Sequence, residues 1–144
     1  MRNCPFCRSE DETVIWRDDF CRVIKVRDDA YPGFCRVIWH GHVAEMTDLP
    51  SSERQRFFSV VMATEAALRR LMNPDKVNLA SFGNMVPHLH WHVIPRFRND
   101  CHFPESIWGV ARNPMVLRPS PDVADISREI AVEMDGVRPV AAAG

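Results

Sequence analysis

Three histidines alternate with apolar residues in the stretch of this chain best suited to chemistry, residues 87–95. The stretch reads Pro-His-Leu-His-Trp-His-Val-Ile-Pro and holds half of the six histidines. Alternation with a period of two is the signal of a β-strand, so we expect His88, His90 and His92 to share one face. Same-face neighbours in a strand lie roughly 6.6 Å apart, which suits a row of groups that serve one substrate.

A row of imidazoles can perform two kinds of chemistry. A neutral imidazole is not repelled by phosphate oxygens and titrates near neutral pH, so it can attack a phosphoanhydride and later leave. The attacking nitrogen needs a lone pair, so the other ring nitrogen must hold its proton against an acceptor such as a backbone carbonyl. Imidazole is also a common zinc ligand, and a zinc enzyme with the metal on all three histidines is an alternative. Histidines on a solvated strand face are a third interpretation, which fits one histidine better than three.

The pattern His-x-His-x-His, with apolar spacers and the trailing Val93-Ile94, resembles the signature of the histidine triad (HIT) nucleotide hydrolases and transferases. The resemblance extends over about residues 4–108. It implies nucleotidyl transfer in which His90 attacks the α-phosphorus, while His92 binds a phosphate oxygen or steers the leaving group's proton. The substrate would be a purine nucleotide derivative, with dinucleoside polyphosphates such as diadenosine tetraphosphate and nucleoside phosphoramidates as candidates. The alternative is a nucleotide-binding regulator with negligible turnover.

The resemblance also implies positions that contact the substrate's phosphate. Gly83 and Asn84 match the turn that precedes the triad strand in the family, where a glycine is followed by a polar residue that contacts phosphate. Asn78 fits a polar position of the strand before that turn. We therefore expect these three residues to contribute to substrate binding.

Two further substrate positions follow from the same resemblance. The family often places a ribose-binding aspartate at the end of its second strand, where this chain has Val26, and we expect Asp28 or Asp29 to take over. Trp108 resembles an aromatic residue that family members place after the triad, often near a dimer partner's site. A homodimer is therefore expected, although Trp108 could instead cover its own core.

A Cys-x-x-Cys motif opens the chain at Cys4-Pro5-Phe6-Cys7. Such a motif is shared by zinc sites and redox pairs. The redox motif belongs at the start of a helix that follows a strand, and no strand is expected before Cys4. Some HIT-family members with this motif bind zinc through four positions, which correspond here to Cys4, Cys7, His42 and His88. The resemblance thus implies a structural zinc, with His40 as competitor for His42, and no organic cofactor. The alternative is a mobile terminus, with His88 only supporting His90.

The expected fold is α+β and HIT-like, with an antiparallel sheet of about five strands, one long helix packed on it and a C-terminal helix. The strands expected besides the triad strand are Thr13–Trp16, Phe20–Val26, Phe34–Trp39 and Val77–Phe82. The C-terminal helix is expected over Pro121–Met134, with Ser120 as its N-cap. We predict a HIT-like domain over residues 1–112 and a C-terminal extension over 113–144.

The long helix is expected over residues 51–72, starting with a capping box formed by Ser52 and Gln55. A mostly apolar stripe at helical spacing should face the sheet: Phe57, Val61, Thr64, Leu68 and Leu71. We interpret Met62 and Met72 as additional core residues. The arginines of the helix are interpreted as its solvated side: Arg54, Arg56, Arg69 and Arg70. Arg96 and Arg98, beyond the triad, fit either a polyphosphate contact or a solvated surface.

Composition restricts the class of protein. The chain has 144 residues with 18 basic and 19 acidic side chains, a net charge of −1 that indicates no broad surface for nucleic acid. It contains no apolar run of membrane-spanning length. Five cysteines, an odd and unevenly spaced number, do not resemble a secreted disulfide framework. We therefore expect a cytoplasmic protein that recognises a small nucleotide in a local site.

Overall fold

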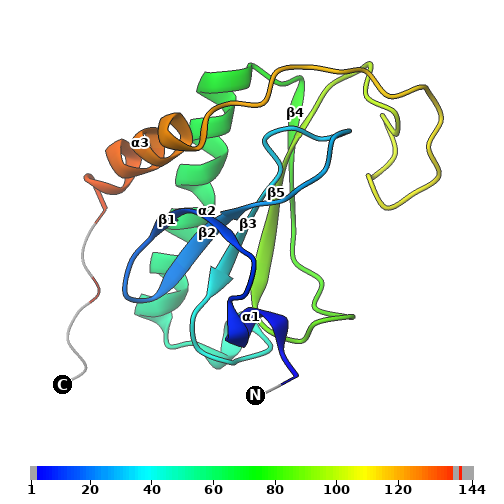
Figure 1. Ribbon diagram of the computed structural model, residues 1–144. Coiled ribbons are helices and arrows are strands. Elements are labelled where there is room, and N and C mark those ends of the chain that lie inside the picture. The colour runs from blue at the N-terminus through cyan, green and yellow to red at the C-terminus, as the bar shows by residue number, and fades with distance from the viewer. Residues whose placement is uncertain (1–2, 138–139, 141–144) are drawn as a thin grey trace.

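Five strands form one antiparallel sheet in a computed structural model that describes residues 3–137 and 140 (Figure 1). The strands are β1 (Thr13–Arg17), β2 (Cys21–Lys25), β3 (Cys35–Trp39), β4 (Lys76–Ala80) and β5 (His90–Arg96). Their order in the sheet is β1-β2-β3-β5-β4, and every neighbouring pair is antiparallel. The helices are α1 (Pro5–Arg8), a short 3-10 helix η1 (Met46–Asp48), α2 (Ser51–Met72) and α3 (Val123–Met134). The predicted α+β class and sheet are confirmed.

The register of the sheet separates its residues into two faces. In the β3–β5 pair, Val37 lies opposite Trp91, and Arg36 lies opposite His92. Val37 is fully buried in the core that contains the apolar residues of α2. Because side chains alternate along a strand, Arg36 and His92 occupy the face that α2 does not cover.

Helix α2 packs on the sheet through a stripe that is wider than the sequence indicated. Its buried residues are Phe57, Val60, Val61, Ala63, Thr64, Ala67 and Leu68. The Thr64 hydroxyl is satisfied because it donates to the Val60 carbonyl oxygen at 2.8 Å. The prediction of Met62 as a core residue is wrong, since it is 54% exposed, whereas Met72 packs against the core.

The start and the charged side of α2 also differ from expectation. The helix begins after Pro50 without a side-chain capping bond, so the capping box of Ser52 and Gln55 is wrong. A capping box exists instead at η1, between Glu45 and Asp48. The arginines are not only solvated. Arg56 donates to Asp18 Oδ2 at 2.8 Å, and Arg70 pairs with two glutamates of α3, Glu129 and Glu133.

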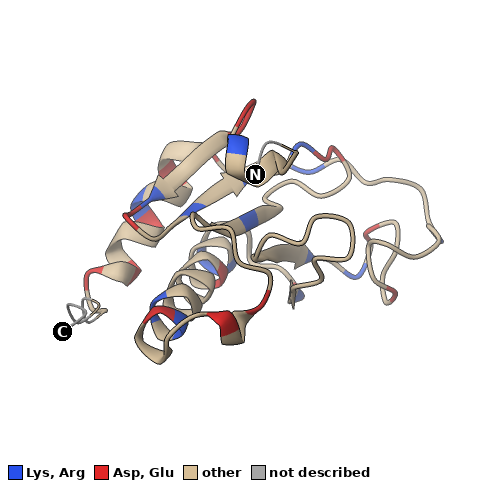
Figure 2. Cartoon of the chain, turned by 90° about the horizontal axis from the view of Figure 1, so that it is seen from below, with Lys and Arg blue, Asp and Glu red and all other residues tan. Residues whose placement is uncertain are grey.

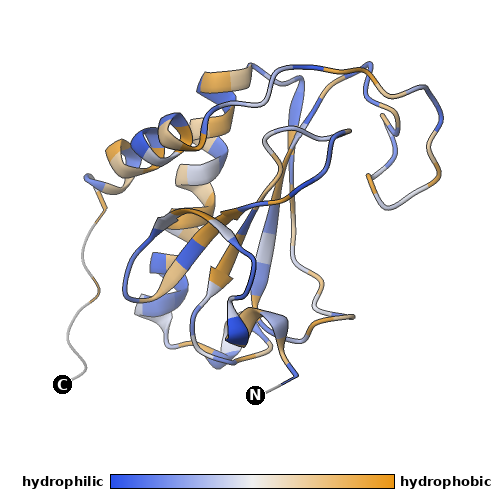
Figure 3. Cartoon of the chain, viewed as in Figure 1, coloured by the Kyte–Doolittle hydropathy of each residue, from blue (hydrophilic) through white to orange (hydrophobic). Residues whose placement is uncertain are grey.

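Helix α3 packs against α2 and β1, and hydrophobic and hydrophilic residues are mixed along it in Figure 3. Its buried residues Ile126, Ile130 and Met134 belong to the same core as the sheet. The N-cap is Asp122, two residues beyond the predicted Ser120, because the extended segment before α3 is longer than expected. Much of the predicted extension 113–144 thus shares the core of residues 1–112, and its residues 138–139 and 141–144 lie outside the described part.

Charged residues of both signs are interspersed along the chain in Figure 2. Within the described residues, no helix is long and apolar enough to cross a membrane.

Candidate active site

His90 and His92 lie side by side on β5, on the face of the sheet opposite α2. They are 7% and 6% exposed, and their ring centroids are 5.0 Å apart. The prediction of one strand for all three histidines is wrong for His88, since β5 begins at His90 and His88 lies in the segment before it, where it is fully buried. The ring of Phe6 in α1 lies edge-on to His90, with centroids 4.8 Å apart, and therefore covers part of this face.

Backbone carbonyls determine which nitrogen carries the proton in His88 and His90. Nε2 of His88 lies 2.6 Å from the Trp39 carbonyl oxygen, and Nδ1 of His90 lies 2.6 Å from the His88 carbonyl oxygen. A carbonyl oxygen can only accept, so His88 is protonated on Nε2 and His90 on Nδ1. Consequently Nδ1 of His88 has a lone pair suited to a metal ion, and Nε2 of His90 has one suited to nucleophilic attack.

The electrostatic surroundings favour neutral imidazoles. Burial lowers the pKa of His90, and the positive charge of Arg36 adds to this, although the bond to the His88 carbonyl acts in the opposite direction. Burial, followed by the effects of His90 and Arg36, lowers the pKa of His92 to about 4. Because removing a charge from water disfavours the imidazolium form, His92 is neutral at pH 7.

Arg36 is part of this site, although its position in an apolar strand gave little indication of it. Its side chain is half-buried, and its Nε donates to His92 Nδ1 at 3.4 Å. It lines a groove of about 420 Å³ together with Phe6, Ile24 and Val26. Arg36 therefore brings a positive charge next to His92.

Four predicted metal ligands meet beside the histidine pair. The donor atoms of Cys4, Cys7, His42 and His88 all lie within 4.8 Å of one another. His88 Nδ1 is 3.3 Å from Cys4 Sγ and 3.2 Å from His42 Nδ1. A tetrahedral zinc with ordinary bond lengths would separate sulfur from nitrogen by about 3.6 Å and two nitrogens by about 3.3 Å. The residues present thus fit a four-coordinate metal ion.

His40, the predicted competitor of His42, has other partners. Its Nε2 lies 2.9 Å from the Asp18 carbonyl oxygen, and its Nδ1 lies 3.3 Å from Arg22 Nη1. Arg22 is itself buried and paired with Glu12 at 2.6 Å. Both nitrogens of His40 are therefore engaged, which leaves His42 at the metal cluster.

The turn before β5 lies at one end of the histidine pair. Gly83 has a φ of +79°, which a glycine adopts without strain, and it lines a pocket of about 260 Å³ together with His88 and His90. Asn84 follows it as an exposed residue. The structure thus brings Gly83 to the pocket of the histidines, whereas Asn84 does not line it.

The side chains of Asp28 and Asn78, both expected to bind substrate, have other partners in the structure. Asp28 Oδ1 accepts from the backbone N–H of Ala30 at 3.0 Å and so stabilises the loop between β2 and β3. The neighbouring Asp29 is exposed. Asn78 lies on β4, where its Oδ1 accepts from Arg96 Nη1 at 2.7 Å. Asn78 is therefore joined to a buried polar network rather than directly to the histidines.

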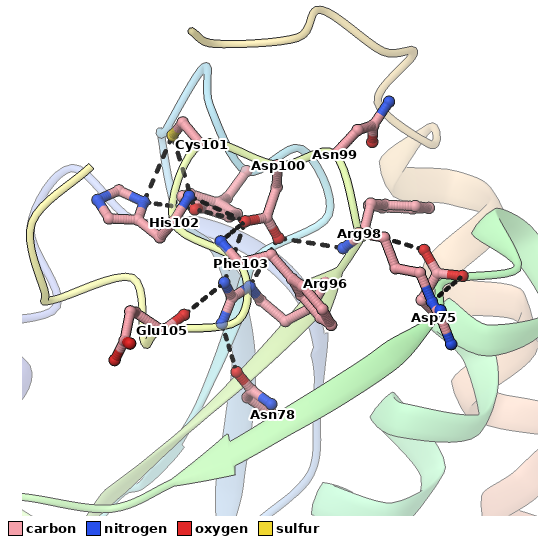
Figure 4. A network of polar contacts seen from close by, with 12 residues as sticks. Asp75, Asn78, Arg96, Arg98, Asn99, Asp100, Cys101, His102, Phe103 and Glu105 are labelled. Atoms are coloured by element: carbon pink, nitrogen blue, oxygen red, sulfur yellow. Dashed lines mark hydrogen bonds and ion pairs between the residues drawn. The ribbon is translucent and has the colours of Figure 1, made fainter. Parts of the chain in front are cut away.

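This network centres on Arg96 and Asp100 (Figure 4). The Arg96 Nε donates to Asp100 Oδ2 at 2.8 Å, and Arg96 Nη2 donates to the Glu105 carbonyl oxygen at 2.7 Å. Asp100 also accepts from the backbone N–H groups of Phe97, His102 and Phe103. Arg96 is 1% exposed, so of its two predicted interpretations the solvated surface is wrong, whereas Arg98 is largely exposed. The network holds the loop after β5 against the sheet.

That loop brings Trp108 next to His92 of its own chain. The Trp108 ring is 5.1 Å from the His92 ring and 4.9 Å from the Phe82 ring, measured between centroids. Trp108 is nevertheless 50% exposed. It therefore borders the candidate site and leaves one side of its ring free.

Sequence reasoning missed Arg36, Phe6 and the role of Arg96. An arginine inside a strand that is otherwise buried was the available signal for Arg36, since a charge there requires a partner or a function. Phe6 was noted only as a spacer of the Cys-x-x-Cys motif. The partners of Phe6 and Arg36 lie far away in the sequence, whereas Arg96 pairs with Asp100 only four residues further on.

Comparisons with known proteins agree with this geometry. The family model described as "HIT domain" matches residues 8–99. The crystal structure of a histidine triad protein from Marinobacter aquaeolei VT8 is 26% identical, with a TM-score of 0.68, over 88% of this chain and 91% of that chain.

Two curated relatives match part of their length. The AP-4-A phosphorylase of Mycobacterium tuberculosis is 27% identical over 93 residues, which are 60% of this chain and 48% of that protein. Adenylylsulfatase HINT3 of Arabidopsis thaliana is 27% identical over 110 residues, which are 70% of this chain and 56% of that protein. This chain thus spans about half the length of the curated relatives that it matches.

Proposed function

This chain belongs to the HIT domain family, and from that premise we propose that it is a nucleotidyl hydrolase or transferase with His90 as its nucleophile. The observation that carries the proposal is the 2.6 Å contact between His90 Nδ1 and the His88 carbonyl oxygen. This contact leaves the lone pair on Nε2, and burial keeps the ring neutral.

In the first step, His90 Nε2 attacks the α-phosphorus of a purine nucleotide derivative. A bond forms between this nitrogen and phosphorus, and the bond from phosphorus to the leaving group breaks, with its electron pair going to the leaving atom. His92 binds a phosphoryl oxygen or the leaving group, while Asn84 and nearby backbone N–H groups stabilise the charge that develops on phosphorus-bound oxygens. The positive charge on the nucleotidylated ring is stabilised by the His88 carbonyl oxygen.

In the second step, water attacks the phosphorus of nucleotidyl-His90. The phosphorus–nitrogen bond breaks, the imidazole leaves in its neutral form, and the water's proton passes to solvent. If another nucleophile took the place of water, it would receive the nucleotidyl group from His90, and the reaction would be a transfer instead of a hydrolysis. Trp108 borders the position of the leaving group or acceptor through its contact with His92.

The metal cluster would have a structural role. Cys4, Cys7, His42 and His88 would hold zinc, which would link α1 to the segment that precedes β5. Zinc would stabilise the placement of the His88 carbonyl, because His88 is both a ligand and the acceptor for His90. The geometry favours this role over a zinc enzyme with metal on all three histidines, since the only lone pair of His88, on Nδ1, faces Cys4, Cys7 and His42.

The names of the two curated relatives support an adenylyl compound as substrate, since one is named for AP-4-A and the other for adenylyl sulfate. Dinucleoside polyphosphates and nucleoside phosphoramidates remain the candidate classes. We also propose a homodimer. A nucleotide-binding regulator would have the same site without measurable turnover.

The test is a small panel of adenylyl compounds with wild-type protein and His90→Ala. We expect wild type to release AMP, and His90→Ala to lose about 10³-fold or more of kcat, as for other nucleophile removals, while it still binds AMP. An acid-labile adenylyl adduct should be trapped on His90. His102→Ala is the matched control, because His102 lies in the polar network and not at the attacking position.

The proposal fails if His90→Ala remains active or if the adduct forms on another residue. Wild-type protein that binds AMP but cleaves no member of the panel would support the regulator instead.

A further inference from the structure

We infer that Arg36 is a positioning residue that holds His92 with its proton on Nε2, so that the site favours substrates whose leaving group departs as an anion. The inference rests on the proposed function and narrows its substrate class to phosphoanhydrides over phosphoramidates. It depends on the relationship of Arg36 to His92 and on the surroundings of its guanidinium group.

The sheet register places Arg36 directly opposite His92 in the β3–β5 pair. The Arg36 Nε lies 3.4 Å from His92 Nδ1. An arginine guanidinium has only donors and keeps its proton at all ordinary pH values, so Nδ1 must be the acceptor. The proton of a neutral His92 is therefore on Nε2.

Arg36 differs in its partners from the two arginines that are fully buried, Arg22 and Arg96. Buried Arg22 and Arg96 each pair with a carboxylate, Glu12 and Asp100. Among the described residues, no carboxylate pairs with Arg36, and its guanidinium lies over the Phe34 ring at 5.7 Å from the centroid. Burying half of a charged side chain without a carboxylate partner costs free energy of folding. A role in the site would explain why an arginine stands at this position.

The contact decides what His92 can do in the reaction. A neutral imidazole protonated on Nε2 can donate a hydrogen bond, but it cannot give up that proton fully, because an imidazolate would result. The form that could give up a proton is the imidazolium, which requires a second proton on Nδ1, where Arg36 already places its own N–H. The low pKa of His92, caused by burial and then by His90 and Arg36, agrees with this restriction.

The two candidate substrate classes make different demands on His92. When a phosphoanhydride is cleaved, the electron pair of the broken phosphorus–oxygen bond stays on a phosphate or sulfate oxygen, which leaves as a stable anion. When a phosphoramidate of an alkylamine is cleaved, the nitrogen must gain a proton before or during departure. A hydrogen-bond donor next to a fixed positive charge stabilises the first leaving group and does not protonate the second.

The kinetic experiment compares Arg36→Met with wild type on two adenylyl substrates, diadenosine tetraphosphate and an adenosine 5′-phosphoramidate of an alkylamine. Wild type should prefer the anhydride. Arg36→Met should lower kcat for the anhydride by about 10²-fold, the size typical of losing one preorganised donor, and should lower kcat for the amidate much less. Arg36→Lys should recover part of the loss, because lysine keeps the charge. Arg27→Met is the matched control, since Arg27 lines the same groove but is exposed.

A readout independent of activity is the ¹⁵N NMR signal of the His92 ring, assigned by its loss in His92→Gln. Wild type should show the form protonated on Nε2, and Arg36→Met should show a mixture of tautomers.

A wild-type ring protonated on Nδ1, or a wild-type preference for the amidate, would overturn the inference. So would an equal rise in KM for both substrates with kcat unchanged, which would indicate that Arg36 only binds phosphate. Failure of wild type to cleave either substrate would refute the proposed function, while the NMR result would still decide the tautomer.

Discussion

The Nε2 atom of His88 lies 2.6 Å from the carbonyl oxygen of Trp39, at the end of β3. Because the carbonyl requires a proton on Nε2, Nδ1 of His88 is left as an acceptor that faces Cys4, Cys7 and His42. The two histidines are therefore opposite tautomers: His88 can bind a metal ion through Nδ1, whereas His90 has its proton on Nδ1.

We therefore expect about one zinc ion per chain in protein purified without added metal. Zinc at a hundred times its Kd would stabilise the fold by about 2.7 kcal/mol, so chelation should lower the melting temperature. Cys4→Ser and His42→Ala should lose the metal. Metal analysis and thermal unfolding, with and without added zinc, provide the measurement.

His40→Ala is the control for this prediction, because His40 contacts Asp18 and Arg22 and not the cluster. It should keep its zinc. Wild-type protein that contains no metal, and whose melting temperature does not respond to zinc, would contradict the site.

The Arg96–Asp100 pair predicts a specific loss of stability in acid. Burial alone would raise the pKa of Asp100, but the Arg96 guanidinium and three backbone N–H groups lower it to about 2, from an ordinary value of 3.8. A carboxyl whose pKa is lower in the folded state contributes stability above its unfolded pKa and loses it as the pH falls towards the folded pKa. The free energy of unfolding should thus fall by about 2 kcal/mol between pH 5 and pH 2 because of this group.

Asp100→Asn should remove this part of the pH dependence. It should also lower stability at pH 7 by about 3 kcal/mol, because it leaves the buried Arg96 charge uncompensated. Urea unfolding at several pH values measures both effects. Equal acid sensitivity in wild type and Asp100→Asn would show that other groups are responsible.

Trp108→Ala should alter the kinetics more than the fold. The ring is 50% exposed and contacts His92 and Phe82, so its removal should cost about 1 kcal/mol of stability or less. It should change the ratio of kcat/KM between substrates with different leaving groups. Steady-state kinetics and thermal unfolding of the same sample test this.

The proposed homodimer is tested separately by light scattering at micromolar concentration, where a mass twice 16.5 kDa is expected. Because Trp108 contacts His92 of its own chain, the Trp108→Ala effect should persist when wild type and variant are diluted. A monomer at micromolar concentration would refute the dimer, and an effect that vanishes on dilution would assign Trp108 to the partner's site.

Apolar packing, rather than ion pairs, should hold α3 on α2. Arg70 bonds Glu129 and Glu133 at 2.7 Å each, but its side chain is 44% exposed, and exposed ion pairs contribute about 1 kcal/mol or less. Ile130 is fully buried between the elements, and truncation of such a residue costs about 2–5 kcal/mol. Arg70→Ala should therefore change the free energy of unfolding far less than Ile130→Ala, as measured in urea. The reverse order would contradict this account of α3.

The sequence by itself determined the strand that carries His90 and His92, the long helix and the α+β class. These features depend on periodicity and on short motifs, which are local properties of the chain. The helix over residues 51–72 was predicted within its observed bounds for this reason. The set of four metal-ligand candidates came from the resemblance to the HIT family, because the Cys-x-x-Cys motif alone supplies only two of them.

Only the tertiary structure decided the partners of the chemical groups. The tautomers of His88 and His90 depend on two backbone carbonyls. Arg36 contacts His92 because of the register of β3 against β5. His40 is not at the metal cluster because it contacts Arg22, which the local sequence does not indicate. Arg96 is buried because Asp100 and Asn78 satisfy its guanidinium group. Side-chain periodicity specifies which face a residue occupies, but strand register and long-range packing specify what it meets there, and hence where its protons lie and what it can catalyse.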